Sequence, residues 1–187
     1  MNNLVSSFAK RLFKCHLIMF FISFIFTFFF GGFLGVDRPV NGYIFSAFVI
    51  LGYGFFLYSE SVIEARKNFY NAKGDRGSID LYLGFKSGAV AHIITYALML
   101  SIFILYYIYQ WFNVTIWAGE IPLHIYLNTA FRFWLLPFLS FFPNSESVNP
   151  LLYILFASFP CIVCGASYIK GMIECKTVKE FEDKKSV

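Results

Sequence analysis

The stretch CHLIMFFISFIFTFFFGGFLGV, residues 15–36, decides the fold class of this chain. It holds no Asp, Glu, Lys or Arg. At about 1.5 Å per residue, a helix of this length crosses the roughly 30 Å hydrocarbon core of a bilayer. Basic residues precede the stretch, and no small-residue cleavage motif follows it. The stretch therefore predicts a retained membrane anchor and not a cleaved signal peptide.

Three further apolar runs have the same character, at residues 43–59, 90–111 and 151–169. The chain of 187 residues is 58% hydrophobic and 14% charged, whereas a soluble domain is about one-quarter charged. We therefore expect an all-α integral membrane protein, a single polytopic domain over residues 1–187 with four transmembrane helices. The run at 43–59 is short for a span, so we expect its helix to continue into the polar segment after it.

The Lys and Arg residues set the expected topology, because cytoplasmic segments of membrane proteins carry the excess of basic residues. Thirteen of the 15 lie before the first run, in the hairpin 60–89 or in the tail after residue 169, and only Arg38 and Arg132 remain. We expect both termini and this hairpin in the cytoplasm, the loop 112–150 outside, and the chain in the cell inner (cytoplasmic) membrane. An outer aromatic belt fits this topology and comprises Trp111, Trp117 and Trp134.

The segment 125–142, IYLNTAFRFWLLPFLSFF, is apolar enough to suggest a fifth span. Arg132 would then lie near its middle, at a cost of about 2.5–3.5 kcal/mol on insertion scales. Pro137 would interrupt the helix, and a fifth crossing would carry the basic tail outside. We expect an in-plane amphipathic helix or a shallow re-entrant segment on the outer leaflet.

The stretch FPCIVCG, residues 159–165, resembles a redox or metal motif, but it lies in an uncharged run. A working dithiol needs a thiolate, which a low-dielectric environment without a nearby cation disfavours. Small residues recur at every fourth position around it, as in membrane helices that pack closely. We therefore interpret it as a helix contact, and the same pattern occurs in the first and third runs. The predicted contact residues are Gly31, Gly35, Ser87, Ala91, Ala157, Cys161 and Gly165.

Glu60 and Glu64 share one helix face at a spacing of four residues, and His92 lies about one turn inside the third run. Two carboxylates and an imidazole near one interface could bind a divalent metal or relay a proton. The interpretation we favour is that the glutamates pair with nearby basic residues and that His92 hydrogen-bonds across the bundle. We therefore assign no catalytic, cofactor or metal site. His16, beside Lys14, is interpreted as interfacial.

The composition disfavours several function classes. The formal charge of +4 is divided among segments that flank the membrane, which does not suggest nucleic-acid binding. A secondary transporter needs more spans or an inverted repeat around a midplane polar site, and an enzyme needs a cluster of polar groups, for which only Glu60, Glu64 and His92 come near. We favour a non-catalytic interaction protein. The alternatives are an oligomeric small transporter or channel, an accessory subunit, or a membrane enzyme using these three residues.

In length, composition and predicted topology, the chain resembles plasmid-encoded inner-membrane proteins of two kinds. These are the surface exclusion proteins of conjugative plasmids (TraS-like), which block redundant DNA transfer, and the immunity proteins against pore-forming bacteriocins. No residue motif carries this resemblance, so it implies no site residues. It implies a protein partner in or at the lipid bilayer and no cofactor, and it is compatible with a homo-oligomer.

The topology is testable with reporter fusions. Alkaline phosphatase, which is active only in the periplasm, should be inactive when fused after Val187 and active when inserted in the loop 112–150. Green fluorescent protein fused after Val187 should fluoresce. Phosphatase activity at the C-terminus would contradict the even number of crossings.

Overall fold

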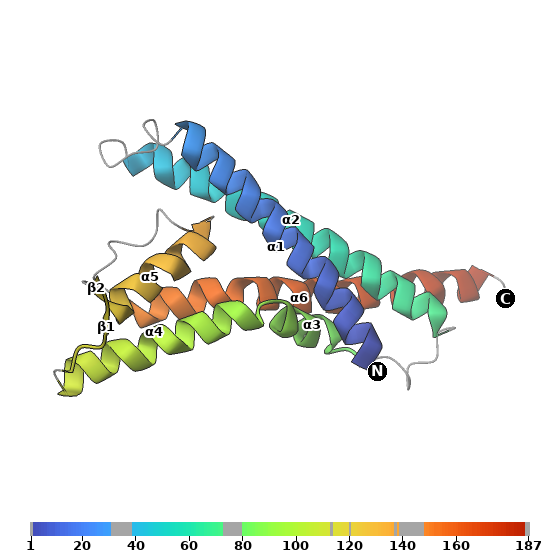
Figure 1. The fold of residues 1–187 in the computed structure, drawn as a ribbon. Coiled ribbons are helices and arrows are strands. Elements are labelled where there is room, and N and C mark those ends of the chain that lie inside the picture. The colour runs from blue at the N-terminus through green and yellow to red at the C-terminus, as the bar shows by residue number, and fades with distance from the viewer. Residues whose placement is uncertain are drawn as a thin grey trace. The chain divides into compact units, whose positions relative to one another are not determined.

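The computed structural model describes residues 2–30, 39–72, 80–112, 114–119, 121–136, 138 and 148–185. Apart from one hairpin of two short strands, the described chain folds into helices (Figure 1). Within these residues, four helices are long and apolar enough to cross a membrane, as predicted, and they indicate a multi-pass membrane protein. The candidate spans are Asn3–Phe29, Val40–Asn71, Ile93–Phe112 and Pro150–Glu180.

The long helices extend beyond the apolar runs that predict them. The first, α1, covers Asn2–Phe30, and the last, α6, covers Pro150–Lys185. The second, α2, covers Pro39–Asn71 and so includes much of the segment expected as a hairpin. Its extension is rich in Glu, Arg, Lys and Ala, which are good helix formers. The helix therefore does not end where the hydrophobic run ends.

The third apolar run is divided between two helices. Helix α3 covers Leu83–Ala91 and α4 covers Ile93–Phe112, with a break at His92. Asp80 forms a turn just before α3, in which its Oδ1 accepts a hydrogen bond of 3.0 Å from the backbone N–H of Tyr82. The Nζ of Lys86 donates to the other carboxylate oxygen at 2.6 Å. The end of the predicted hairpin 60–89 thus belongs to a short helix.

The segment predicted as interfacial begins with α5, Leu123–Trp134, a helix of 12 residues. At about 1.5 Å per residue it is roughly 18 Å long, too short to cross a bilayer core of about 30 Å. Its buried residues, His124, Asn128 and Phe131, share one face. Residues 137 and 139–142 of the predicted segment lie outside the described residues. The orientation of α5 relative to a bilayer stays a prediction.

A hairpin precedes α5 and pairs β1, Trp117–Ala118, with β2, Ile121–Pro122. Gly119 lies in its turn with a φ of 70°. That left-handed backbone conformation is common for glycine and strained for most other residues. The sequence analysis did not predict this hairpin.

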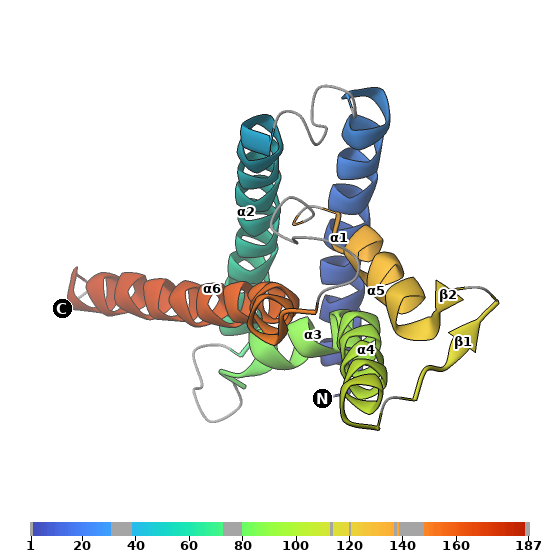
Figure 2. The ribbon, with the colours of Figure 1, turned by 90° about the vertical axis from the view of Figure 1, so that its left-hand side faces the viewer.

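The chain divides into two compact units. Unit 1 contains Met1–Cys15, Gly54–Ala91 and Phe159–Val187, and unit 2 contains His16–Tyr53 and His92–Ser158. The antiparallel helices α1 and α2 contribute a part to each unit (Figure 2). Within unit 2 they meet through Phe26 and Phe45, whose ring centroids are 5.4 Å apart.

In unit 1, helices α3 and α6 approach each other closely at glycines. A Cβ built on Gly84 would lie 2.6 Å from the backbone oxygen of Cys164, and one on Gly88 would lie 3.0 Å from the Cα of Cys161. On the opposite side of the contact, a Cβ on Gly165 would lie 2.3 Å from the ring of Phe85. These distances leave no room for a side chain at Gly84 or Gly165 unless the helices separate.

The predicted contact residues have distinct places in the described structure. Cys161 and Gly165 lie in the contact between α3 and α6, where the Sγ of Cys161 donates to the backbone oxygen of Phe85 at 3.4 Å. The Oγ of Ser87 donates to the backbone oxygen of Val5 in α1 at 3.4 Å. Ala91 is buried in unit 1 and Ala157 in unit 2. Gly31 and Gly35 lie outside the described residues.

Adding a methyl group at Gly84 should separate α3 from α6. We expect Gly84→Ala to lower the free energy of unfolding by about 1–3 kcal/mol, because the obstructing atom is a backbone oxygen that cannot move aside. Gly52→Ala is the matched control, since a Cβ there meets only the terminal methyl of Met19 at 3.7 Å. Thermal unfolding in detergent, followed by circular dichroism, compares the two. Equal stabilities would contradict the close contact.

Candidate functional site

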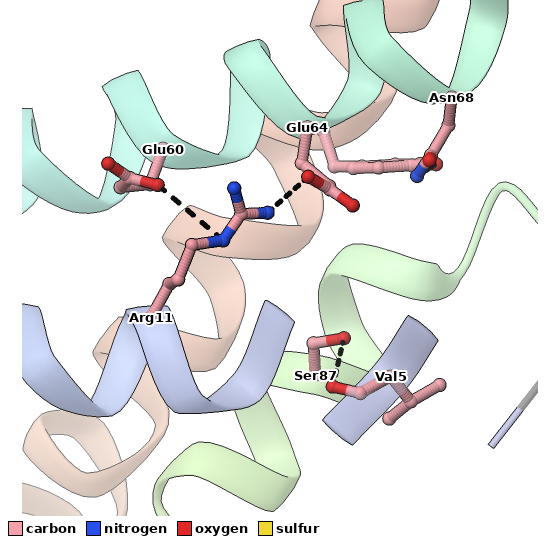
Figure 3. Close-up of polar contacts among 7 residues, drawn as sticks. Val5, Arg11, Glu60, Glu64, Asn68 and Ser87 are labelled. Carbon is pink, nitrogen blue, oxygen red and sulfur yellow. Dashed lines mark hydrogen bonds and ion pairs between the residues drawn. The ribbon is translucent and has the colours of Figure 1, made fainter. Parts of the chain in front are cut away.

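An ion-pair cluster joins α1 to α2 in unit 1 (Figure 3). The Nη2 of Arg11 donates to the Oε2 of Glu64, and its Nε lies 4.0 Å from the Oε2 of Glu60. The two glutamates stand one turn apart on α2 and therefore face the same point of α1. Glu64 is only 4% exposed, so its charge depends on Arg11 for compensation.

Further polar contacts join the other helices of unit 1. The Nδ2 of Asn68 donates to the hydroxyl of Tyr168 at 3.1 Å, which links α2 to α6 (Figure 3 labels Asn68). The Nη2 of Arg66 lies 3.2 Å from the Oε2 of Glu174 in the same pair of helices. These contacts are exposed or half-buried, so each contributes little to stability. They fix the register of α2 against α6.

A buried histidine cluster lies in unit 2 and comprises His16, Tyr53, His92, Thr95 and Trp134. The hydroxyl of Tyr53 lies 3.1 Å from the Nδ1 of His16 and 2.7 Å from the Nε2 of His92. The exposed fractions of His16, Tyr53 and His92 are 1%, 0% and 2%. One hydroxyl therefore joins two imidazoles out of contact with solvent.

Trp134 and Thr95 complete the histidine cluster. The ring centroid of Trp134 is 4.8 Å from that of His16. Its Nε1 donates to the Oγ1 of Thr95 at 2.8 Å, which holds the indole in place. The cluster thus draws on α1, α2, α4 and α5 and on the break between α3 and α4. Ionisable groups within a membrane protein are costly, so such a cluster is a candidate functional site.

The three residues considered as a metal or catalytic set make separate contacts within their own units. Glu60 and Glu64 face Arg11 in unit 1, whereas His92 belongs to unit 2 and bonds to Tyr53. Within the described ranges, no group of three or more His, Cys, Asp or Glu side chains is placed to hold a metal ion. The hydrogen bond of His92 is of the kind that the favoured interpretation expects.

His16 was interpreted as interfacial because Lys14 is close in sequence. Its side chain is 1% exposed, so it faces other helices of unit 2, and its depth in a bilayer stays a prediction. An α-helix turns by about 100° per residue, so a neighbour two positions away faces a different direction. Sequence reasoning missed Tyr53 and the contact of Trp134 with His16, which join distant segments.

A second polar group in unit 2 anchors α5. The hydroxyl of Tyr153 in α6 donates to the Oδ1 of Asn128, and the Tyr153 ring stacks on Phe131 with centroids 4.9 Å apart. His124 stacks on Tyr109 of α4 at 5.1 Å. Burial lowers the pKa of His124 from its ordinary value, which favours the neutral imidazole. Burial likewise lowers the pKa of Arg132, and this effect is partly opposed by Tyr153.

Comparison with protein-family models, curated proteins and solved structures gives no match. Two groups of polar side chains stand out in the described residues of this multi-pass membrane protein. They are the ion-pair cluster of Arg11, Glu60 and Glu64 in unit 1 and the histidine cluster in unit 2. The geometry of the ion-pair cluster suits it to joining helices, and the geometry of the histidine cluster suits it to binding protons.

Removing one member of the ion-pair cluster should cost more than removing all of its charges. We expect Glu64→Ala to destabilise the protein by about 1–3 kcal/mol, because Arg11 loses its closest partner but keeps Glu60 at 4.0 Å and is partly exposed to solvent. The triple variant Arg11→Met, Glu60→Gln, Glu64→Met removes every charge at similar volume and should be close to the unmodified protein in stability. Thermal unfolding in detergent measures both. A Glu64→Ala protein of unchanged stability would contradict a structural ion pair.

Proposed function

We propose that this chain is a non-catalytic protein of the cell inner membrane that acts by binding another protein within or beside the bilayer. The exposure of its candidate spans carries this proposal. In the most apolar 18-residue stretch of α4, only 11% is buried within the protein, and in the corresponding stretch of α1 the share is 22%. Most of the surface of these helices is therefore available to lipid or to a partner.

The exposed side chains are of the kind that a partner helix can contact. On α4, the exposed residues include Ile93, Leu100 and Ile104. Lipid tails are as apolar as these side chains, so a partner is held by shape and close packing and not by hydrophobicity alone. Beyond the end of α4, Trp117 and Ile121 of the hairpin are exposed as well. Exposed apolar residues next to polar loops are typical of protein or membrane contacts.

The polar groups support this class over an enzyme. An enzyme that used Glu60, Glu64 and His92 would have to present all three to one substrate. In the structure, both glutamates face Arg11, and His92 bonds to Tyr53. An oligomeric transporter or channel stays the alternative, since exposed spans also suit self-association.

The role that best fits is surface exclusion in conjugation, or immunity to a pore-forming toxin. The support is the resemblance in length, composition and predicted topology to the proteins that perform these tasks. In exclusion, the loop 112–150 or the cytoplasmic segment after residue 59 would bind a component of the donor's mating apparatus. In immunity, the lipid-facing side of α4 would intercept inserted toxin helices. Neither role needs a cofactor.

The two roles can be measured in cells that express the chain. For exclusion, the cells serve as recipients and the frequency of plasmid transfer is counted. For immunity, survival is counted after treatment with a panel of pore-forming bacteriocins. We expect Leu100→Ala with Ile104→Ala to weaken protection about tenfold or more if α4 is the contact, since losing one contact worth about 1.4 kcal/mol has that effect.

Two controls accompany this measurement. Ile154→Ala with Leu155→Ala removes exposed side chains of α6 and should leave protection unchanged, at a membrane level equal to that of the unmodified chain. The charge-free triple variant Arg11→Met, Glu60→Gln, Glu64→Met should also protect. Absence of any protection by the unmodified chain in both assays would overturn these roles, and loss in the triple variant alone would favour the enzyme.

A further inference from the structure

In the histidine cluster, one tyrosine hydroxyl lies between two imidazole rings and cannot donate its hydrogen to both. A tyrosine hydroxyl has a single hydrogen, so it donates one hydrogen bond and accepts others. Tyr53 lies within hydrogen-bonding distance of both His16 and His92. At least one imidazole must therefore donate an N–H to the tyrosine oxygen, and the other can accept the tyrosine hydrogen.

The two distances agree with one assignment of these roles. O–H donors form shorter hydrogen bonds than N–H donors, typically about 2.7–2.8 Å against about 2.9–3.0 Å. In that assignment, Tyr53 donates to the Nε2 of His92 at 2.7 Å, and the Nδ1–H of His16 donates to the oxygen of Tyr53 at 3.1 Å. A neutral His16 with its hydrogen on Nδ1 has a bare lone pair on Nε2.

That second nitrogen of His16 is buried and has no partner. Among the residues that the structure describes, the Nε2 of His16 has no hydrogen-bond partner, and the side chain is 1% exposed. Leaving a buried acceptor unsatisfied costs about 1–3 kcal/mol. A buried lone pair at the end of a chain of hydrogen bonds is a position that can accept a proton.

We propose that His16, Tyr53 and His92 form a proton-binding relay that takes up one proton at the Nε2 of His16 and passes it to His92. Protonation at Nε2 converts His16 into an imidazolium. Its Nδ1 proton then moves to the oxygen of Tyr53 as the hydroxyl proton of Tyr53 moves to the Nε2 of His92. The transfer is reversible. The state with a neutral His16 carrying its hydrogen on Nε2, a neutral Tyr53 and an imidazolium at His92 exchanges with the imidazolium at His16, so the positive charge is shared between the two histidines.

The surroundings of the relay limit it to one proton. Among the described residues of unit 2, the titratable groups that contact His16 are Tyr53 from α2 and His92 from the break before α4. Helix α4 contributes Thr95 and α5 contributes Trp134, neither of which titrates near neutral pH. The ring centroids of the two histidines are 5.3 Å apart, and two positive charges at that distance repel each other. The pair therefore titrates as one coupled unit.

Trp134 provides a direct optical test in the full-length protein. The chain has three tryptophans, so Trp111→Phe with Trp117→Phe leaves Trp134 as the only one. A positive imidazolium 4.8 Å from the indole interacts with its face and quenches its fluorescence, whereas a neutral imidazole quenches less. On titration in nanodiscs from about pH 8 to about pH 3, a range that extends below the ordinary histidine range because burial disfavours the charged imidazole, we expect emission to fall in one transition with the steepness of a single proton.

Matched variants distinguish the relay from other histidines. His16→Gln should abolish the fall in Trp134 emission. His124→Gln, which changes a buried histidine on the same helix as Trp134, should leave it unchanged. An emission that does not change with pH, or a transition that persists in His16→Gln, would overturn the proposal.

Nitrogen-15 NMR of histidine in the unmodified protein tests the transfer without relying on a variant that must fold. We expect His16 and His92 to shift together at one midpoint, and Tyr53→Phe to give each histidine a separate midpoint. Tyr126→Phe, which removes an exposed hydroxyl, should leave the common midpoint intact. Separate midpoints in the unmodified protein, or a hydrogen on the Nε2 of His16 at neutral pH, would overturn the relay. The proposal does not depend on the partner-binding role and survives its failure.

Discussion

Water is the partner that an unpaired polar side chain would otherwise use, and a bilayer core does not supply it. A polar group carried into such a core must therefore be satisfied within the protein. This constraint explains why Tyr53 joins two histidines and why Asn128 pairs with Tyr153. Burial within the protein imposes the same requirement on Glu64, which pairs with Arg11. Each of these contacts joins different helices, so the same bonds that satisfy polar groups also fix how the helices of a unit pack.

Close packing supplies the rest of the cohesion. In lipid, helices gain little from hiding apolar surface, because the tails are equally apolar, so association depends on shape. The α3–α6 contact of unit 1 shows how this is achieved, with Gly84 and Gly88 against the backbone of α6 and Phe85 over Gly165. The long helices keep most of their phenylalanine and isoleucine side chains exposed. At the α3–α6 contact, the size of a side chain decides more than its hydrophobicity whether a residue fits.

Sequence alone predicted the features that depend on local composition. The four apolar runs predicted the four candidate spans. Arg132 and Pro137 argued against a fifth span over residues 125–142. The helix described there, α5, has only 12 residues, and residues 137 and 139–142 lie outside the described residues. The break at His92 was not predicted, because neither glycine nor proline marks it. Gly84 and Gly88 were missed although their spacing of four residues was legible. The histidine cluster could not be predicted, because its hydrogen bonds join residues 37 and 39 positions apart.

The glycine contact also bears on how this sequence can drift over generations. On the lipid-facing sides of α1 and α4, one apolar residue can replace another at little cost in stability, so these positions can vary. At Gly84, where a backbone oxygen occupies the space that any larger residue would need, no such exchange is neutral. Descendants of this chain would therefore diverge quickly in their phenylalanines while holding this glycine fixed. A distant homologue would therefore be easier to recognise by the glycines of the α3–α6 contact than by the large residues that face lipid.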